Sequence, residues 1–380
     1  MNVKNKNINQ CQNHPLRAGG IIIAGGGTGG HIFPAIAIAN AIKKLQPNTD
    51  ILFIGAEGKM EMEKIPQAGY PIKGLTIAGF NRSSFIKNIT LPYKIIKSFF
   101  QVQSIFKQFK PIAVIGVGGY SSFPVLRLAQ SKGIPTFIHE SNSFAGKANM
   151  MLGKKATKVF VASDGMDKFF PANKIIITGN PVRASIVQST ITKTEALHFF
   201  GLDDTKKTIL IVGGSLGAKS INDAIANHIK TFADKDLQLV WQTGKTNANN
   251  YKTIAEGKPN IWVGEFIAKM EMGYAAADVV VSRAGAMAVT ELCVSGKPTV
   301  FVPYPFAAED HQTANAMALV NKQAALLVKD NDVDEVLVNT VLELCKNELS
   351  QQVLKQNISA FAIKNADEII AKEIVNTITS

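Results

Sequence analysis

The fold class follows from one stretch near the start of the chain, Ile21–Ile42, which has the sequence IIIAGGGTGGHIFPAIAIANAI. Its first residues are apolar and β-branched, as in a buried strand, and its second half has the apolar spacing of a helix. Residues 25–30 are all Gly or Thr, so they allow a tight turn between the two elements. A strand, a glycine-rich turn and a helix in this order indicate a parallel α/β fold, with a helix N-terminus that can bind an anion.

The same alternation of short apolar runs and longer helical patterns continues along the chain. Strands are expected at residues 20–24, 51–54, 113–117, 136–139, 158–162 and 175–178, and again at 208–212, 237–242, 261–263, 279–282, 299–302 and 325–328. A second glycine-rich turn, GGSLGA at 213–218, follows the first strand of the second set. Because 380 residues exceed the size at which one hydrophobic core keeps growing, we expect two Rossmann-like, doubly wound domains that face each other across a ligand cleft.

The domain limits follow from this division. Residues 1–18 are polar and are expected to be a disordered extension. The first domain is expected at 19–182 and the second at 183–355, with a linker around 179–194. Residues 356–380 are expected to form a helix that packs back on the first domain.

Composition excludes several classes of protein. With 46% hydrophobic and 18% charged residues, the chain is globular and neither disordered nor collagen-like. Its three cysteines have no short spacing, so neither a disulfide framework nor a zinc cluster is expected. No apolar run reaches the ~18–20 residues that span a bilayer, and the N-terminus lacks the apolar segment of a secretory signal. A soluble, cytoplasmic chain is expected. Neither a metal nor a cofactor is expected.

Positive charge is concentrated in the first half of the chain. The net charge is +12, and residues 1–180 hold 22 basic and 7 acidic side chains. Such a surface attracts nucleic acid, anionic lipid or phosphorylated ligands. No nucleic-acid-binding motif is present, so nucleic acid is not an expected partner.

Aromatic and aliphatic residues accompany this charge between residues 79 and 109. Residues 79–91 have no helical period and are expected to form a basic, apolar loop. Beyond them, one stripe at helical spacing is expected to face the core; it comprises Ile95, Phe99, Val102, Phe106 and Phe109. A basic, apolar loop beside a basic helix suits docking on an anionic membrane surface. The alternative is an ordinary solvated face over a core, and both remain open.

The first glycine-rich turn is a candidate binding site. Gly25, Gly27 and Gly30 match the dinucleotide pattern GxGxxG, but Glu57 lies farther along than the acidic residue that would hold a ribose. An NAD-type oxidoreductase is therefore a weaker alternative, and glycines that serve only helix packing are another. His31 directly follows the turn. Since imidazole changes protonation near neutral pH, His31 is a candidate base for a hydroxyl group.

Polar motifs also follow other predicted strands, where a doubly wound sheet binds ligands. HESN at 139–142 offers Glu140 and Asn142 as hydrogen-bond partners for sugar hydroxyls. In GNPVR at 179–183, Arg183 has the fork geometry that pairs with a diphosphate. Glu291 lies in the first turns of a predicted helix and can accept both hydroxyls of a ribose.

Eight motifs in order, from Gly19 to Ala316, resemble the MurG family, the peripheral membrane N-acetylglucosaminyltransferases of peptidoglycan synthesis, which have the GT-B fold. They are GGGTGGHIFPAIAIA, GVGGYSS, HESN, GNPVR, GGSLGA, EFI, SRAGAMAVTE and HQTANA. The resemblance implies that UDP-N-acetylglucosamine donates its sugar to the 4-hydroxyl of the muramoyl unit of lipid I, with inversion, giving lipid II. The first domain would then bind the acceptor and the membrane, and the second the UDP-sugar. Alternatives are another GT-B enzyme, such as a UDP-sugar 2-epimerase, and a non-catalytic module of the membrane surface.

The resemblance also implies roles for particular residues. Donor contacts are implied for Thr28, Gly29, Gly30, Asn142, Arg183, Ser215, Ile267, Ala286, Met287, Ala288, Val289, Thr290, Glu291 and Gln312. Among these, Ile267 lies near the uracil, Glu291 on the ribose and Gln312 on the sugar. His31 acts on the acceptor side as the candidate catalytic base. The sequence departs from the family pattern at Ser141 and Leu216, which each replace a glutamine, and residues 304–310 differ from the sequence of enterobacterial members.

Membrane contact is placed on the basic, apolar loop of the first half. The residues expected there are Ile77, Phe80, Arg82, Phe85 and Lys87. The resemblance places the protein peripherally on the cytoplasmic face of the inner membrane. Its expected partners are UDP-N-acetylglucosamine, lipid I and an anionic membrane surface.

Overall fold

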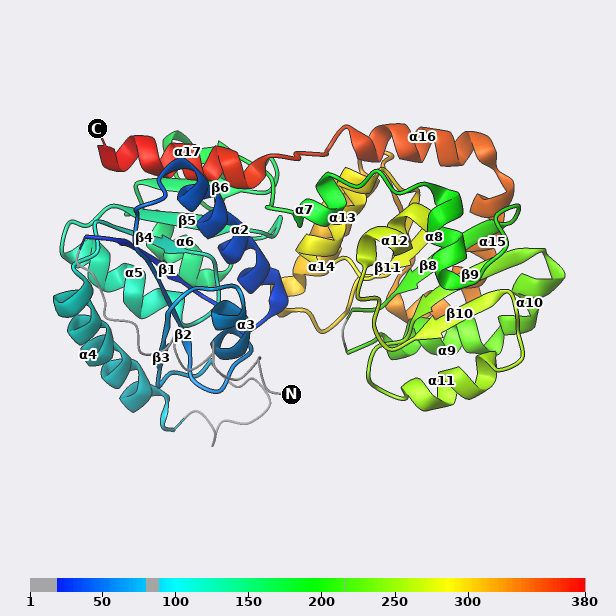
Figure 1. Ribbon diagram of the computed structural model, residues 1–380, viewed down its shortest axis with the longest axis horizontal. Coiled ribbons are helices and arrows are strands. Elements are labelled where there is room, and N and C mark those ends of the chain that lie inside the picture. The colour runs from blue at the N-terminus through cyan, green and yellow to red at the C-terminus, as the bar shows by residue number, and fades with distance from the viewer. Residues whose placement is uncertain (1–18, 80–88, 215, 380) are drawn as a thin grey trace. The chain divides into compact units, whose positions relative to one another are not determined.

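The computed structural model describes residues 19–79, 89–214 and 216–379, which form two compact units (Figure 1). Unit 1 contains the residues up to Val182 together with those from Asn365 onward, and unit 2 is Arg183–Lys364. Each unit is built around its own parallel sheet.

The sheet of unit 1 has the order β3-β2-β1-β4-β5-β6-β7, with every neighbouring pair parallel. Its strands are β1 (Ile21–Ala24), β2 (Ile51–Ala56), β3 (Ile72–Leu75), β4 (Ala113–Gly116), β5 (Thr136–Glu140), β6 (Lys158–Val161) and β7 (Ile175–Ile177). The order changes direction between β1 and β4, so the turns that follow these two strands lie side by side. Sequence analysis did not predict β3, because Lys73 and Gly74 interrupt its apolar pattern and it pairs only with β2.

Both faces of this sheet are buried. Ile21 and Ile23 of β1 belong to one apolar cluster, and Ile22 and Ala24 to the other, as expected for a parallel sheet covered by helices on both faces. The helices of unit 1 are α2 (Gly29–Leu45), α3 (Glu61–Gln67), α4 (Leu91–Phe109), α5 (Ser122–Ser131), α6 (Lys147–Gly153), the 3-10 helix Ala172–Lys174 and α17 (Ala366–Thr379).

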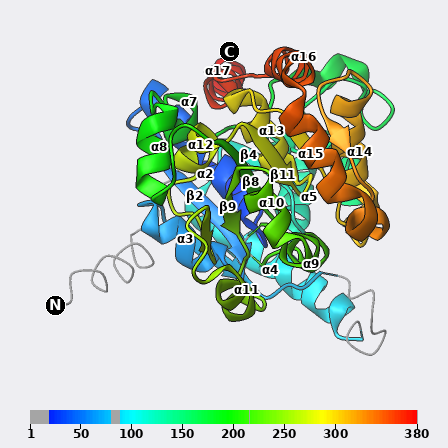
Figure 2. The same ribbon diagram turned by 90° about the vertical axis from the view of Figure 1, so that its right-hand side faces the viewer.

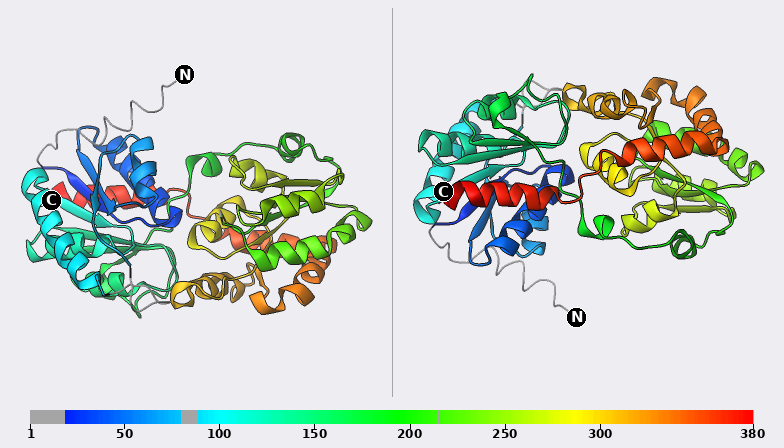
Figure 3. Two further views of the ribbon diagram at one scale, coloured as in Figure 1. Left: turned by 90° about the horizontal axis from the view of Figure 1, so that it is seen from below. Right: turned by 90° about the horizontal axis from the view of Figure 1, so that it is seen from above.

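The last helix of the chain, α17, belongs to unit 1. It lies against α2 (Figure 3), and its Ile370 and Ile374 are fully buried in the same cluster as β1. Lys44 of α2 pairs with Glu368 at 2.9 Å. The tail expected at 356–380 is thus divided, because α16 ends at Ser359 in unit 2 and α17 begins at Ala366.

Helix α4 buries a shorter stripe than the sequence predicts. Val102, Phe106 and Phe109 are buried as expected. Ile95 is instead exposed, which corrects the prediction, and Phe99 is only half-buried. Within residues 91–100 only Ser98 is buried, so the N-terminal half of α4 extends beyond the core that its C-terminal half covers.

Unit 2 repeats the architecture with the sheet order β10-β9-β8-β11-β12-β13, again entirely parallel. Its strands are β8 (Lys207–Val212), β9 (Leu237–Gln242), β10 (Ile261–Gly264), β11 (Val279–Ser282), β12 (Thr299–Phe301) and β13 (Leu326–Leu327). All twelve predicted strands are therefore present in the two sheets.

Helices cover both faces of the second sheet as well. They are α7 (Ala184–Val187), α8 (Lys193–Phe200), α9 (Lys219–Asn227), α10 (Ile229–Asp234), α11 (Ala248–Ala255), α12 (Met270–Ala276), α13 (Ala286–Ser295), α14 (His311–Val320), α15 (Val338–Lys346) and α16 (Glu348–Ser359), with 3-10 turns at Ala308–Asp310 and Asp330–Asp332 and a π-helix at Val333–Leu337. Helices α9, α10, α11 and α15, labelled in Figure 2, contribute residues to the buried cluster that contains Ile209 and Ile211. On the other face, Leu210 approaches Gly273 of α12.

In the part of the chain that the structure describes, no helix is both long and apolar enough to cross a bilayer.

Candidate functional site

The first glycine-rich turn joins β1 to α2 in unit 1. Thr28 is the N-cap residue of α2, but its side chain does not cap the helix, and the first turn carries no acidic residue. The first N–H groups of a helix have no partner within it and attract anions. Gly29 and Gly30 provide two of these groups, at the positions predicted to contact the donor.

The turn after β4 packs directly against this first turn. A Cβ atom on Gly119 would lie 2.6 Å from the Gly26 carbonyl oxygen, and one on Gly118 would lie 2.8 Å from His31 Nε2. Glycine is required at both positions, because a side chain would displace the backbone or the imidazole. The motif GVGGYSS therefore helps to shape the space around His31.

His31 is half-buried at the start of α2, beside the glycine-rich turn. Its Nδ1 lies 3.0 Å from the Gly26 carbonyl oxygen and 3.4 Å from Thr28 Oγ1. A carbonyl oxygen only accepts hydrogen bonds, so the closer contact requires a hydrogen on Nδ1. In the neutral ring Nε2 then carries the lone pair and can accept a proton.

A buried carboxylate occupies the other side of the same turn. Glu61 is only 1% exposed, and its Oε2 accepts a hydrogen bond from the Gly27 N–H at 2.8 Å. Its Oε1 accepts from the Ala56 N–H at 3.0 Å, at the end of β2. In a dinucleotide-binding site the Gly27 N–H would bind a phosphate of the ligand. Here it donates to the carboxylate of Glu61 instead. Sequence analysis missed Glu61, although an acidic residue one turn past a strand end could have indicated it.

His139, at the end of β5, is fully buried. The pKa of His139 is lowered to about 4, mainly by burial and to a smaller extent by the positive charge that His31 can carry. The ring is therefore neutral at pH 7. Ser141, which replaces the family's glutamine, is buried two residues on, with its Oγ 3.4 Å from His139 Nδ1.

Glu140 holds the loop after β5 in place and is not accessible to a ligand. It is 4% exposed and accepts hydrogen bonds from the Asn142 N–H at 3.1 Å, the Gly146 N–H at 3.1 Å and Asn149 Nδ2 at 2.8 Å. The carboxylate thus ties the end of β5 to the start of α6. Asn142 is held in this loop and remains half-buried, so it is the member of HESN that can reach a ligand.

In unit 2 the second glycine-rich turn joins β8 to α9. Ser215 lies outside the described residues, and its neighbour Leu216 is 72% exposed. Gln242, at the end of β9, donates to the Gly214 carbonyl oxygen at 3.2 Å and accepts from the Ile267 N–H at 2.9 Å. One side chain thus connects the turn to the residue predicted to lie near the uracil. Gln242 was not predicted, but a polar residue that ends the run LQLVWQ was a usable signal.

Arg183 and Glu291 lie against each other. Arg183 Nε and Nη2 donate to Glu291 Oε1 at 3.1 and 2.9 Å, and the Tyr274 hydroxyl donates to Glu291 Oε2 at 2.9 Å. Glu291 is 8% exposed, so its charge depends on these donors. Burial first, and the carboxylate second, raise the pKa of Tyr274 well above its ordinary value. The sequence predicted Arg183 and Glu291 as separate donor contacts and did not predict Tyr274.

The N-terminus of α13 provides a second anion-binding helix end. Gly285 is the N-cap residue, and no acidic side chain lies in the first turn. Residues 286–290 are half-buried, which leaves the start of the helix accessible. The predicted contacts Ala286, Met287, Ala288, Val289 and Thr290 therefore lie together with Glu291 on one element.

Gln312, on α14, accepts a hydrogen bond from the Tyr304 N–H at 3.0 Å. This contact joins α14 to the segment that follows β12. Arg283, in the turn before α13, is held by Asp330 at 2.5 Å and by the Val302 carbonyl oxygen at 3.1 Å. Arg283 therefore stabilises the turn, and Arg183 is the better candidate for a ligand contact.

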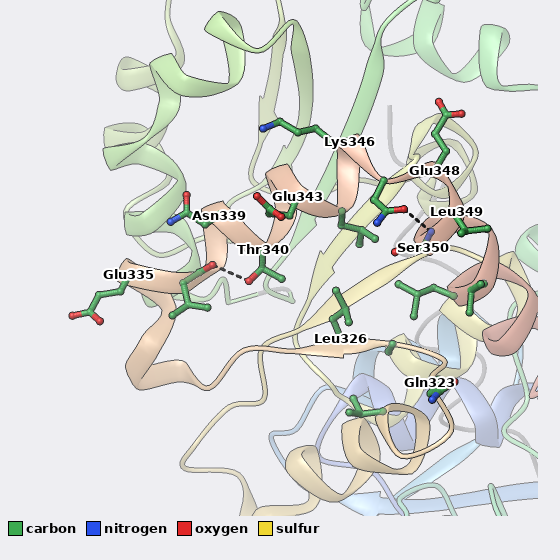
Figure 4. Close-up of a pocket in the computed structure, with 17 residues that line it drawn as sticks. Gln323, Leu326, Glu335, Asn339, Thr340, Glu343, Lys346, Glu348, Leu349 and Ser350 are labelled. Carbon is green, nitrogen blue, oxygen red and sulfur yellow. Dashed lines mark hydrogen bonds between the residues drawn. The ribbon is translucent and has the colours of Figure 1, made fainter.

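A wide groove elsewhere in unit 2 is separate from these residues. It has a volume of about 1520 Å³ and is lined by residues of β13, α15 and α16, among them Leu326, Asn339 and Leu349 (Figure 4). None of the predicted site residues is among the described residues that line it. No group of three or more His, Cys, Asp or Glu side chains within residues 19–79, 89–214 and 216–379 could hold a metal ion.

Both halves of the chain match one enzyme family. Residues 21–161 match the N-terminal domain of glycosyltransferase family 28, and residues 208–373 match its C-terminal domain. The chain belongs to glycosyltransferase family 28. This membership, together with the two parallel sheets, confirms the predicted GT-B fold class of two doubly wound domains.

Similar proteins match this chain along nearly their whole length. Proteins from Phocaeicola vulgatus and Cytophaga hutchinsonii are each 49% identical to this chain, over 93% and 94% of it and over 95% and 97% of their own lengths. Both are named UDP-N-acetylglucosamine--N-acetylmuramyl-(pentapeptide) pyrophosphoryl-undecaprenol N-acetylglucosamine transferase. The crystal structure of MurG from Acinetobacter baumannii has a TM-score of 0.77 and 30% identity, covering 94% of this chain and 99% of that one. A UDP-N-acetylglucosamine 2-epimerase, with 14% identity and a TM-score of 0.66, shares the fold alone.

The buried His139 predicts a pH-dependent stability. Its folded pKa of about 4 lies below the ~6.5 of a histidine in an unfolded chain, so between these values the unfolded state binds more protons. Stability must then fall as the pH is lowered through this window. We expect His139 to reduce the free energy of unfolding by about 2 kcal/mol between pH 7 and pH 5, measured by urea unfolding.

His139→Gln should remove this pH-dependent contribution to the free energy of unfolding. His198→Gln, at an exposed position, should not. Equal pH dependence of the wild type and His139→Gln would contradict the assignment.

Proposed function

We propose that this chain transfers N-acetylglucosamine from UDP-N-acetylglucosamine to the 4-hydroxyl of the muramoyl unit of lipid I, giving lipid II for peptidoglycan synthesis. The observation that carries the proposal is the 49% identity, over nearly the full length of both chains, to enzymes that bear this activity in their names. The site geometry supports it, because each unit offers a helix N-terminus suited to a phosphorylated or polar ligand.

Unit 2 binds the UDP part of the donor. The N-terminus of α13 and Arg183 stabilise the negative charge of the diphosphate as it leaves. Glu291 accepts the ribose hydroxyls, and Tyr274 and Arg183 hold its carboxylate in place before the donor binds. The uracil lies at Ile267. The Ile267 N–H donates to Gln242 Oε1, and this hydrogen bond must break before the N–H can bind the base. Ser215 and Gln312 complete the donor contacts on this unit.

Unit 1 supplies the groups that act at the acceptor and at the transferred sugar. His31 Nε2 takes the proton of the 4-hydroxyl as that oxygen attacks the anomeric carbon. The new C–O bond forms on the face opposite the diphosphate, whose C–O bond breaks, so UDP leaves and the configuration inverts. Thr28, Gly29, Gly30 and Asn142 position the sugar portion of the donor.

A UDP-sugar 2-epimerase is the second candidate, because it shares the fold. The two activities differ in their need for an acceptor. We expect UDP release from UDP-N-acetylglucosamine only when a short-chain lipid I analogue is present, and a loss of about 10²- to 10⁴-fold in His31→Ala, the usual contribution of a general base. The assay is coupled detection of UDP. Equal release without the acceptor would contradict the proposed transferase and favour a hydrolysing epimerase.

The Tyr274 hydroxyl is expected to affect donor binding through Glu291. Tyr274→Phe removes one of the hydrogen bonds to a buried carboxylate, an interaction of about 1.5–3 kcal/mol. We expect UDP-N-acetylglucosamine to bind about tenfold more weakly to this variant, as measured by calorimetry. Tyr251→Phe is a matched control, because it also removes a hydrogen bond to a carboxylate, from Tyr251 to Asp223 at 2.7 Å. An unchanged affinity in Tyr274→Phe would show that Glu291 does not need this donor.

Peripheral association with the cytoplasmic face of the inner membrane is part of the proposal. Tyr93, Ile96 and Phe100 of α4 are 66%, 59% and 68% exposed, and Lys94 and Lys97 lie among them in the sequence. Apolar side chains beside lysines suit an anionic lipid surface. Of the contacts expected from the sequence, Phe80, Arg82, Phe85 and Lys87 lie outside the described residues, and Ile77 is half-buried against the core of unit 1.

Sedimentation with vesicles tests this surface. We expect the wild type to bind phosphatidylglycerol-containing vesicles better than neutral ones, because the exposed apolar side chains are accompanied by positive charge. Ile96→Asp with Phe100→Asp should abolish the binding, whereas Leu349→Asp, at a 71% exposed apolar position of unit 2, should preserve it. Equal binding by the α4 variant would exclude this surface.

A further inference from the structure

The peptide unit between Gly26 and Gly27 is held at both of its polar ends by side chains. Its N–H, on Gly27, donates to Glu61 Oε2 at 2.8 Å. Its carbonyl oxygen, on Gly26, lies 3.0 Å from His31 Nδ1. One peptide unit thus lies between a buried carboxylate and the candidate catalytic histidine.

We infer that Glu61 is a positioning residue for His31, acting through this peptide unit. A trans peptide is planar, with its N–H and C=O pointing in opposite directions. By fixing the N–H, Glu61 therefore also fixes the direction of the carbonyl oxygen. That oxygen accepts the hydrogen of Nδ1, which leaves the lone pair of the neutral imidazole on Nε2.

The contacts of Glu61 hold the carboxylate itself in place. Its second oxygen accepts from the Ala56 N–H at 3.0 Å, so the group is anchored to the end of β2. It also sits at the first residue of α3, where the helix dipole favours a negative charge. A Cβ atom on Gly26 or Gly55 would lie 2.3 or 2.4 Å from Glu61 atoms, so both glycines leave the space that the side chain fills.

The preceding peptide unit, between Gly25 and Gly26, is also held. The Gly26 N–H donates to the Gly118 carbonyl oxygen at 3.3 Å, and Gly118 borders His31 Nε2. The turns after β1 and β4 therefore fix the histidine together. A negative charge on the N–H side also polarises the peptide and makes its carbonyl a stronger acceptor for Nδ1–H. In this arrangement the peptide bond stands where a carboxylate directly orients the histidine of a catalytic triad.

The consequence for proton transfer rests on the proposed function, but the state of the imidazole does not. We would label the full-length protein with ¹⁵N-histidine and assign the His31 signals by comparison with His31→Gln. The expected result for the wild type is a hydrogen on Nδ1 at a pH where the ring is neutral. In Glu61→Gln only one of the two side-chain atoms can accept a hydrogen bond, and the NH₂ group then faces the other backbone N–H. We therefore expect a mixture of the two His31 tautomers.

Kinetics provides the second measurement. Turnover with the lipid I analogue should fall about 10- to 100-fold in Glu61→Gln, as when the orienting partner of a metal-bound histidine is removed. Affinity for UDP should be unchanged, because unit 2 binds UDP. An unchanged ¹⁵N signal of His139, which is fully buried in unit 1, shows that the variant is folded. Glu63→Gln is the matched control: Glu63 is exposed on the same helix, and its side-chain carboxylate contacts Lys64 and Gln67.

The outcomes are distinguishable. A hydrogen on Nε2 in the wild type would overturn the inference, as would an unchanged tautomer and turnover in Glu61→Gln. If Glu61→Gln does not fold, Glu61→Asp replaces it, because its side chain is one methylene too short to reach both amides, and the same change of tautomer is expected. If the wild type shows no acceptor-dependent turnover, the proposed function fails, while the spectra still decide whether Glu61 sets the tautomer of His31.

Discussion

A buried carboxylate must be surrounded by hydrogen-bond donors, and the candidate site depends on this constraint at three glutamates. Glu61 accepts from the backbone at the first glycine-rich turn, and Glu140 accepts from the loop after β5. Glu291 accepts from Arg183 and Tyr274 in unit 2. Most of these donors lie at the ends of regular elements, such as Ala56 at the end of β2 and Gly146 at the start of α6. The charge that is costly to bury is thus what fixes the loops that face a ligand.

The fold was predictable because it depends on local patterns that the sequence displays directly. Short β-branched runs such as Ile21–Ala24 are buried on both faces of a parallel sheet, and this leaves a strong apolar signal. The glycine-rich turns were predictable for a similar reason, since close backbone contacts such as that between Gly119 and Gly26 exclude side chains. The edge strand β3 was missed, because a strand paired on one side tolerates Lys73 and Gly74 and so has a weaker pattern.

The site was predictable only in part. The motifs indicated which residues follow strand ends. The structure places Thr28 and Asn142 in the turns after β1 and β5, and Glu291 within α13, the helix that follows β11. The partners of these residues come from distant parts of the sequence, as with Glu61 beside Gly27 and Tyr274 beside Glu291. Such pairings depend on tertiary packing, which periodicity and spacing do not report. The inward face of α4 was mispredicted at Ile95 for the same reason, because only the tertiary structure shows how far the core extends.

The position of α17 has a consequence for synthesis of the chain. Unit 1 contains both ends of the described chain, so unit 2 is inserted within it between Val182 and Asn365. On the ribosome, domains generally fold as they emerge, from the N-terminus onward. Here the sheet of unit 1 emerges before unit 2, but Ile370 and Ile374 of its core are made only after unit 2. Unit 1 is therefore completed only after unit 2 has been made, and until then one flank of α2 lacks the helix that covers it.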